Sequence, residues 1–402
     1  MLTACSAKPR QAPAPAGETG ATVLLISIDG FRWDYLDRGL TPTLSRLAHE
    51  GVRAEALVPV FPTKTYPNHY TIVTGRYPAR HGIVGNVLTA PDIGRRLTLW
   101  DRDAVRDPRF YVAEPIWVTA ERQGRRTAPL FWPGSEAPIN GVRPVHWLEY
   151  DGKMPDTARI GWVLERLLLP PERRPTFLTL YFSLVDEAGH DHGPDAPETD
   201  AAIARADSLV GRVVGGLETA GRTDVNLVVV SDHGMASTGP ERVIWLDEYL
   251  AAEAMQVDEM STLLTAWPRP GLEDSVHRAL ERAPRVTVYR RDDLPARYRM
   301  EGPRVPPILG VAEEGWTMAR RTPERPTPTI SLGNHGYDDT LPSMRGIFVA
   351  RGPGLRSGAW VPAFRNIHLQ PLLVHLLGLR PVVTDGTLDS VRALLRRSGG
   401  AK

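Results

Sequence analysis

The chain has 402 residues, of which 42% are hydrophobic and 24% are charged, and its formal net charge is +1. This length allows one large domain or two ordinary ones, and the composition supports a globular core without cross-links. The near-neutral charge argues against a nucleic-acid groove or a polybasic membrane surface. The single cysteine, Cys5, excludes disulfide scaffolds and thiolate metal sites in the folded body, so oxygen and imidazole would have to hold any metal.

The first 20 residues predict a tether. Leu2-Thr3-Ala4-Cys5 is typical of a bacterial lipoprotein cleavage site, and the Ala- and Pro-rich stretch after it is typical of a flexible linker. Only four residues precede Cys5, fewer than a signal peptide needs, so two interpretations stay open. In one, the protein is bacterial and periplasmic, or is anchored to the outer membrane through a lipid on Cys5. In the other, the pattern is accidental and the protein is soluble.

Strand and helix patterns alternate after the tether. In chain order we expect a strand at 22–28, a helix at 42–51, a strand at 52–60, a helix at 68–74, an irregular stretch at 87–113, a helix at 114–123, strands at 127–131 and 177–185, a helix at 200–220, strands at 226–231 and 345–350, and a helix at 368–377. This alternation predicts an α/β fold with an open, mostly parallel sheet flanked by helices.

Residues 240–330 interrupt the alternation. They are rich in Pro and Arg, with short mixed signals. We expect an insertion that covers one side of a site, so that residues 21–395 form a single catalytic domain.

Three apolar runs end on residues that bind metals in other proteins. Thr22–Ile28 leads to Asp29, Phe177–Val185 leads to Asp186, and Asn226–Ser231 leads to Asp232 and His233. Ligands of open α/β sheets bind beyond the carboxyl ends of the strands. The recurrence therefore predicts one site, although each motif alone is more often a turn.

Two further histidines complete the predicted set. His190 follows Asp186 by four residues, a spacing that places both side chains on one side of a helical turn. His335 lies between glycines that allow close approach of the backbone. Three carboxylates and three imidazoles form a set that suits two zinc ions, which can hold both oxygens of a phosphoryl displacement.

The attacking oxygen is expected from the hydroxyl-rich segment Phe61–Tyr70. Thr65 would stand at the start of a helix, where exposed N–H groups and the helix dipole favour an anion. Thr63 is the alternative nucleophile, and both threonines could instead be capping residues.

The chain resembles the nucleotide pyrophosphatase/phosphodiesterases of the alkaline phosphatase superfamily. The resemblance extends from about Ala21 to Leu379 and depends on motifs distributed along the chain, namely Ile28-Asp29-Gly30-Phe31-Arg32, Phe61–Tyr70, Tyr77-Pro78 with His81-Gly82-Ile83, Glu114-Pro115-Ile116-Trp117, Trp132-Pro133-Gly134-Ser135, Gly189-His190 with Gly193-Pro194, Ser231-Asp232-His233-Gly234 and Gly333-Asn334-His335-Gly336. It implies an alkaline-phosphatase-like fold and a zinc-dependent hydrolase that releases nucleoside monophosphates through a phospho-threonine intermediate.

The resemblance also implies residue roles. Thr65 would be the nucleophile, and the Asn86 amide would hold a phosphate oxygen. One zinc would take Asp29, Thr65, Asp232 and His233, and the other would take Asp186, His190 and His335. The substrate pocket would contain Tyr66, Trp132, Tyr150 and Tyr181, where an aromatic ring can stack on a base. Tyr150 could instead be a strand-edge aromatic of the core.

Other functions stay open. Leu184-Val185 precede Asp186 where animal members usually carry an acidic residue and Pro, which puts the substrate preference in doubt. A phosphomonoesterase or a phospholipid head-group phosphodiesterase of the same superfamily would use similar ligands. A zinc-stabilised binding protein without catalysis is the alternative from a different class.

Overall fold

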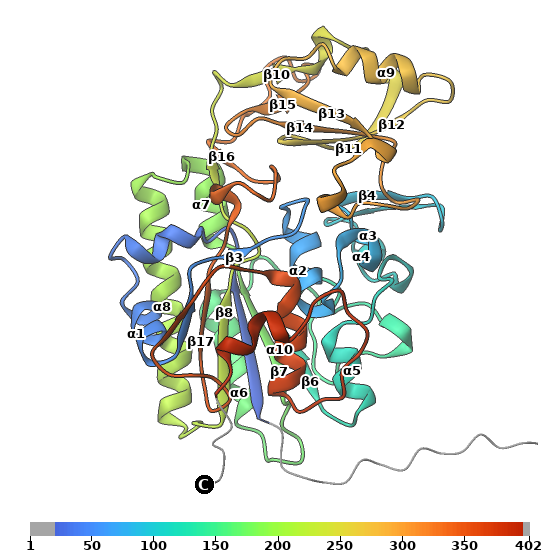
Figure 1. The fold of residues 1–402 in the computed structure, drawn as a ribbon. Helices are drawn as coiled ribbons and strands as arrows, with labels where there is room; N and C mark the ends of the chain where they lie inside the picture. The colour runs from blue at the N-terminus through green and yellow to red at the C-terminus, as the bar shows by residue number, and fades with distance from the viewer. Residues whose placement is uncertain (1–20, 397–402) are drawn as a thin grey trace, which may run out of the picture.

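A seven-stranded sheet with the order β18-β2-β17-β8-β1-β7-β6 forms the centre of the protein (Figure 1). The computed structural model describes residues 21–396. The strands are β1 (Thr22–Ile28), β2 (Val52–Ala54), β6 (Thr127–Pro129), β7 (Phe177–Phe182), β8 (Val225–Val230), β17 (Phe348–Arg351) and β18 (Ala359–Val361). β17 is antiparallel to both of its neighbours, and the other pairs are parallel. The predicted α/β class with a mostly parallel sheet is confirmed.

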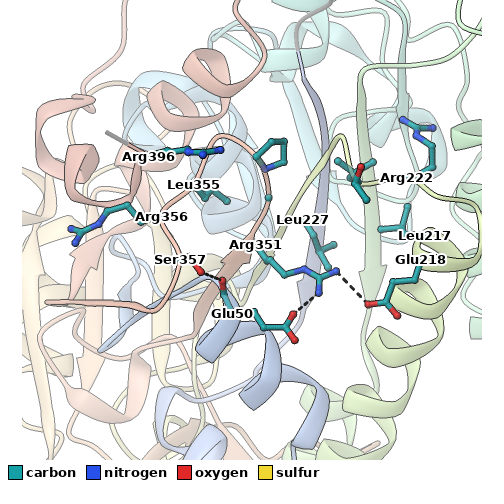
Figure 2. Close-up of a pocket in the computed structure, with 14 residues that line it drawn as sticks. Glu50, Leu217, Glu218, Arg222, Leu227, Arg351, Leu355, Arg356, Ser357 and Arg396 are labelled. Atoms are coloured by element: carbon teal, nitrogen blue, oxygen red, sulfur yellow. Dashed lines mark hydrogen bonds and ion pairs between the residues drawn. The ribbon is translucent and has the colours of Figure 1, made fainter. Parts of the chain in front are cut away.

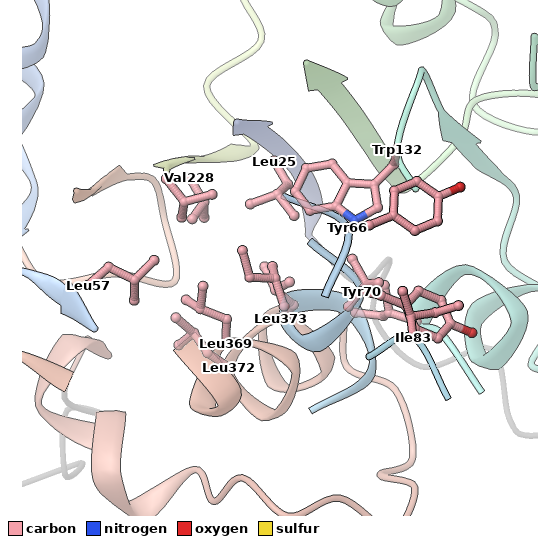
Figure 3. Close-up of a cluster of buried hydrophobic side chains, with 14 of the residues drawn as sticks. Leu25, Leu57, Tyr66, Tyr70, Ile83, Trp132, Val228, Leu369, Leu372 and Leu373 are labelled. Carbon is pink, nitrogen blue, oxygen red and sulfur yellow. The ribbon is translucent and has the colours of Figure 1, made fainter. Parts of the chain in front are cut away.

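Helices cover both faces of this sheet, so the central strands are buried on both sides. Val23 and Leu25 of β1 belong to one hydrophobic cluster, and Leu24 and Ile26 belong to the other. The first cluster contains side chains of α2 (Thr65–Thr74), α5 (Ile116–Arg122) and α10 (Leu369–Leu376). Figure 3 shows its centre, where Leu25 and Val228 face Leu369, Leu372 and Leu373. The second contains side chains of α1 (Pro42–Glu50), α6 (Asp156–Leu167) and α8 (Pro197–Thr219).

The largest differences from the predicted strands and helices are at 52–60, 68–74 and 177–185. The strand predicted at 52–60 is two short strands, β2 and β3 (Leu57–Val58). The helix predicted from Asn68 begins at Thr65, because a proline in the first helical turn lacks only an N–H that would have no partner there. The strand predicted to 185 ends at Phe182, because Ser183 takes helical angles and starts α7 (Leu184–His192). Asp186 therefore lies in the first turn of α7 and not at a strand end.

The stretch predicted to be irregular, 87–113, contains a hairpin and short helical segments. β4 (Val87–Ala90) pairs with β5 (Arg95–Thr98), and α4 (Arg102–Val105) follows. The arginines and Thr89 within these strands concealed their alternation from the sequence pattern.

A second, antiparallel sheet lies at one end of the central sheet (Figure 1). It contains β11 (Met255–Met260), β12 (Leu263–Pro268), β13 (Val286–Arg290) and β14 (Ile308–Ala312), with α9 (Glu273–Leu280) nearby. Two small two-stranded sheets flank it, β10 (Val243–Trp245) with β15 (Thr317–Ala319), and β9 (Ala236–Ser237) with β16 (Gly333–Asn334). The division into a single domain of residues 21–395 with an insertion at about 240–330 stays a prediction.

Among residues 21–396, no helix combines the length and the apolar character that crossing a lipid bilayer requires. Cys5 and the predicted tether at 1–20 lie outside the described residues.

Candidate functional site

One group of predicted ligands gathers beyond the ends of β1 and β8. Asp29 directly follows β1, and Asp232 and His233 lie just beyond β8. His233 Nε2 lies 3.4 Å from Asp29 Oδ1 and 3.0 Å from Asp232 Oδ2. Because the two strands are parallel neighbours, their carboxyl ends deliver these side chains to the same edge of the sheet.

The second group comes from α7 and the segment after β16. His190 Nε2 lies 3.5 Å from Asp186 Oδ2, and His335 Nε2 lies 3.7 Å from Asp186 Oδ1. The rings of His233 and His335 stack with centroids 3.6 Å apart, so the two groups adjoin. The structure thus brings all six predicted side chains together, while their role as ligands stays a prediction.

A glycine allows the two groups to approach each other. Gly30 has a φ of +66°, and a Cβ on it would lie 2.8 Å from the Cα of Asp186. Any side chain at this position would collide with α7.

Each of the three carboxylates has one buried oxygen that accepts no hydrogen bond from residues 21–396. These atoms are Asp29 Oδ1, Asp186 Oδ1 and Asp232 Oδ2. A buried anionic oxygen without a partner is costly, and native proteins almost always compensate for it. Divalent cations would supply the missing charge and coordination, so these residues fit a metal centre.

The hydrogen bonds of the three imidazoles leave one nitrogen of each ring available to a metal ion. In each ring Nδ1 lies near a backbone carbonyl, at 2.8 Å from Gly333 O for His190, 2.9 Å from Gly234 O for His233 and 2.9 Å from Thr63 O for His335. A carbonyl can only accept, so Nδ1 carries the proton and Nε2 keeps its lone pair. Histidines that bind metals typically donate their other ring N–H in this way.

One buried histidine of the site, His69, was not predicted from the sequence. Its Nδ1 lies 2.8 Å from Thr65 O and 3.3 Å from Asp232 Oδ2, and its Nε2 lies 2.8 Å from Ser27 Oγ. Both ring nitrogens are therefore engaged by protein groups, so His69 holds the turn at Thr65 and lies against Asp232. The only signal in the sequence was the spacing of four residues from Thr65 within a helix.

The field in the site favours cations. Burial and the neighbouring Asp232 and Asp186 raise the pKa of Asp29 well above its ordinary value. Burial also disfavours ionisation of Asp232, but the His233 and His69 imidazoles outweigh it and hold the pKa of Asp232 low. Burial opposes protonation of His233, yet the Asp232 carboxylate raises its pKa. The negative charge of Asp232 that attracts a proton to this ring also attracts a metal ion.

Thr65 is the first residue of α2 and faces this cluster. Its Oγ1 lies 3.2 Å from His233 Nε2. Thr63, the alternative nucleophile, is fully buried, donates to Tyr337 O at 2.9 Å and accepts the Gly336 N–H at 3.0 Å. A hydroxyl used in both directions by the backbone is not free to attack, so the geometry favours Thr65.

Asn86 lies beside the start of α2. Its Oδ1 accepts the N–H of Tyr66 at 2.8 Å, which leaves the side-chain NH₂ as the group that can donate to a ligand. This contact holds the amide next to the residue that follows Thr65.

A hollow of about 380 Å³ opens beside Thr65. All four predicted pocket residues line it, namely Tyr66, Trp132, Tyr150 and Tyr181. Tyr150 is 39% exposed and belongs to no strand, so the alternative of a core aromatic is wrong. The hollow also contains the ion pair of Arg102 with the buried Glu136, which no sequence pattern indicated.

A larger hollow, of about 930 Å³, lies at the opposite end of the sheet, near the start of β8 (Figure 2). Arg351 bridges Glu50 and Glu218 there. It contains no aspartate or histidine among its lining residues. Within residues 21–396, the two clusters of side chains that could hold a metal ion both belong to the site at Thr65.

The sequence of the chain matches a known family over most of its length. The model of the family described as type I phosphodiesterase / nucleotide pyrophosphatase matches residues 23–338. The chain belongs to this family. As a member of the nucleotide pyrophosphatase/phosphodiesterases of the alkaline phosphatase superfamily, it is related to known hydrolases.

Human ectonucleotide pyrophosphatase/phosphodiesterase family member 5 is 36% identical over 93% of this chain and 78% of its own length. A mouse bis(5'-adenosyl)-triphosphatase is 35% identical over 93% of this chain and 81% of its own length. The structure of murine ectonucleotide pyrophosphatase/phosphodiesterase 5, an inactive variant in complex with AMP, has a TM-score of 0.89, 35% identity and coverage of 94% of this chain and 100% of that chain. The fold and the family predicted from the sequence are therefore confirmed.

Proposed function

We propose that this family member is a two-zinc phosphodiesterase/pyrophosphatase that cleaves nucleotide phosphodiester or phosphoanhydride bonds and releases nucleoside 5'-monophosphates. The observation that carries the proposal is that three carboxylates, each with one unpartnered oxygen, gather around His233, whose Nε2 lies 3.2 Å from the Thr65 hydroxyl. Such a set suits phosphoryl transfer, in which catalysis consists mainly of positioning and charge stabilisation.

The two cations would divide the ligands as the family resemblance implies. Asp29, Thr65, Asp232 and His233 would hold one, and their contacts of 3.0–3.4 Å to His233 support this set. Asp186, His190 and His335 would hold the other. When bound, zinc neutralises the phosphate and lowers the pKa of the hydroxyl and water that attack it.

The chain's own residues would perform two displacements. In the first, Thr65 Oγ1 bonds to phosphorus while the bond to the leaving oxygen breaks, which gives phospho-threonine. In the second, water attacks the same phosphorus and Thr65 leaves. The start of α2 and the Asn86 NH₂ would stabilise the charge that develops on the phosphoryl oxygens.

The aromatic hollow supports a nucleotide as substrate. Stacking of a base on tyrosine or tryptophan contributes about 1–3 kcal/mol, and the rings of Tyr66 and Tyr150 line the hollow next to Thr65. The solved structure of the inactive murine ectonucleotide pyrophosphatase/phosphodiesterase 5 variant is a complex with AMP, which agrees with this assignment. Arg102 is the one arginine among the described residues that line the hollow, and it forms an ion pair with Glu136. The hollow therefore offers no unpaired arginine from this part of the chain to bind the additional negative charge of a phosphomonoester.

A substrate panel with and without chelator tests the proposal. We expect bis-p-nitrophenyl phosphate and a nucleotide diester to be hydrolysed far faster than p-nitrophenyl phosphate or glycerophosphocholine. Preference for the monoester or for the lipid head group would replace the proposal with one of the superfamily alternatives. Nucleotide binding without any product would indicate a zinc-stabilised binding protein.

Substitution of the nucleophile makes the test specific. Thr65→Ala should abolish turnover while the zinc content stays near two per chain. Thr63→Ala is the matched control, because it removes a neighbouring hydroxyl that only bonds to the backbone. Retention of most activity in Thr65→Ala would reject the assignment.

The cellular location stays a prediction. A lipid on Cys5 and a periplasmic or outer-membrane location were inferred from the first residues alone, and the relatives reported above come from human and mouse. Mass spectrometry of the mature N-terminus from the native source would test it.

A further inference from the structure

Glu259 of β11 is one of the side chains through which the insertion reaches the candidate site. This carboxylate accepts the backbone N–H groups of Asn86 and, at 3.0 Å, of Val87. The side chain of Glu259 is only 9% exposed. Asn86 in turn accepts the N–H of Tyr66, the residue after the proposed nucleophile. A continuous chain of hydrogen bonds thus joins the insertion to the start of α2.

A strand irregularity aims Glu259 at this loop. The register of β11 against β12 shifts between Val257 and Glu259. The preceding residue, Asp258, accepts the N–H of Thr89 at 2.7 Å, so two consecutive carboxylates bind the same hairpin. In a regular strand they would point to opposite faces, and a bulge is the usual means of redirecting one of them.

The loop is shaped to receive this carboxylate. A Cβ on Gly85 would lie 2.7 Å from Glu259 Oε1. The absence of a side chain at Gly85 therefore lets the carboxylate approach the two N–H groups closely.

Glu259 also faces the residue that precedes Thr65. Its Oε2 lies 3.9 Å from Lys64 Nζ, and Lys64 is 6% exposed. Lys64 Nζ donates to Ser261 Oγ at 3.2 Å, which is a second contact from the insertion. Glu259 is therefore linked to both sides of Thr65, through Lys64 before it and through Asn86 and Tyr66 after it.

We propose that Glu259 is a positioning residue that holds the Asn86 amide where it can donate to the phosphoryl group, so that the site is complete only when the insertion is in place. This inference rests on the proposed function. Glu259 acts through Asn86 and contacts no reacting atom.

The first test is kinetic and uses the full chain with bis-p-nitrophenyl phosphate. Glu259→Ala should lower kcat about 10- to 100-fold, less than the roughly 100- to 1000-fold cost of losing an anion-stabilising donor itself. Glu259→Gln keeps a carbonyl that accepts both N–H groups, so it should restore most of the rate. Adding Glu259→Ala to Asn86→Ala should lower kcat by no more than about 3-fold, because the amide that Glu259 positions is already absent.

Asp258→Asn is the matched control, since it weakens an adjacent hydrogen bond from the same hairpin to the insertion, the one that Thr89 N–H donates to Asp258. It should lower the melting temperature and leave kcat within about 3-fold of the wild-type value. Gly85→Ala should reproduce the kinetic defect of Glu259→Ala, because its Cβ would lie 2.7 Å from Glu259 Oε1 and 2.8 Å from Val87 O, which separates the carboxylate from the loop while all polar groups remain. If Glu259→Ala does not fold, Glu259→Gln and Gly85→Ala carry the test.

Backbone amide hydrogen exchange provides a readout that is independent of activity. Glu259→Ala should accelerate exchange at Asn86 and Val87, and Asp258→Asn should accelerate it at Thr89. Unchanged exchange at Asn86, a kcat near the wild-type value, or independent effects in the double variant would each overturn the proposal. If the wild-type protein hydrolyses no diester, the proposed function fails, and the exchange rates alone decide whether Glu259 holds this loop.

Discussion

The Tyr181 hydroxyl donates a 2.6 Å hydrogen bond to Asp29 Oδ2. The two residues lie at the carboxyl ends of neighbouring parallel strands, since Asp29 directly follows β1 and Tyr181 is the last residue but one of β7. With Oδ2 engaged, Asp29 Oδ1 is the oxygen left without a partner and is oriented for a cation. Tyr181 therefore lines the aromatic hollow with its ring and fixes a predicted metal ligand with its hydroxyl.

Tyr181→Phe should weaken zinc binding about 10- to 100-fold, the usual cost of losing a hydrogen bond to a metal ligand. Competition with a chelator of known affinity measures this change. Tyr150→Phe is the control, because Tyr150 lines the same hollow and has no hydrogen bond to a predicted ligand among residues 21–396. Equal zinc affinity in the two variants would contradict the role of the hydroxyl.

Gly30→Ala should disrupt the site by two effects, the unfavourable positive φ and the collision with Asp186. Gly39 allows the two effects to be measured separately. Its φ is +77°, but nothing lies within 4 Å of a Cβ built on it, so only the backbone effect is present there. Gly39→Ala should cost about 1–2 kcal/mol of unfolding free energy, the price of a left-handed conformation alone. Gly30→Ala should cost more and should also lower the zinc content, as denaturant titration and metal analysis will show. Equal costs would mean that α7 moves aside freely.

The sequence predicted the parts of the site that local patterns encode. Asp29 and Asp232 follow runs of apolar residues that can only be buried strands, and the spacing of Asp186 and His190 is a helical one. The strand ends also implied that these residues share one edge, because topology restricts where parallel strands terminate.

Contacts between distant segments were not predictable. Glu259 and Asn86 are 173 residues apart, and their link depends on a shift of strand register that leaves no mark in the hydrophobic pattern. The role of His69 depends on which side of α2 faces the sheet, and almost the whole of that helix is buried. The helix start at Thr65 was misplaced because Pro67 suggested a boundary that the first helical turn tolerates.

Removal of the metal should destabilise the protein as well as inactivate it. Without cations, burial and the nearby charges of Asp232 and Asp186 disfavour the ionised Asp29 carboxylate, as its raised pKa indicates. Chelation should lower the melting temperature, and each tenfold rise in free zinc above the dissociation constant should return about 1.4 kcal/mol per site. Thr65→Ala should retain a zinc-dependent shift, because the six carboxylates and imidazoles remain. A melting temperature that does not respond to chelator would contradict the metal centre.

His81 should make the protein sensitive to mild acid. It is fully buried, accepts the Ile83 N–H on Nδ1 and lies with Nε2 at 3.0 Å from Thr71 Oγ1, so it is held as the neutral ring, and burial lowers its pKa to about 3. Its unfolded-state pKa is near 6.5, so the unfolded chain binds a proton below this pH while the folded protein does not. The stability that the neutral ring provides is complete above pH 6.5 and is lost as the pH falls toward 3.

Between pH 7.5 and pH 5 this single group should remove about 2 kcal/mol of unfolding free energy. Urea titrations at the two pH values measure the loss, and His81→Gln should reduce it by that amount even if the variant is less stable overall. His49 is a suitable control, since it is a histidine of α1 that lies outside the buried core, and His49→Gln should leave the difference unchanged. An equal pH dependence in wild type and His81→Gln would show that the buried ring is not the source of the acid sensitivity.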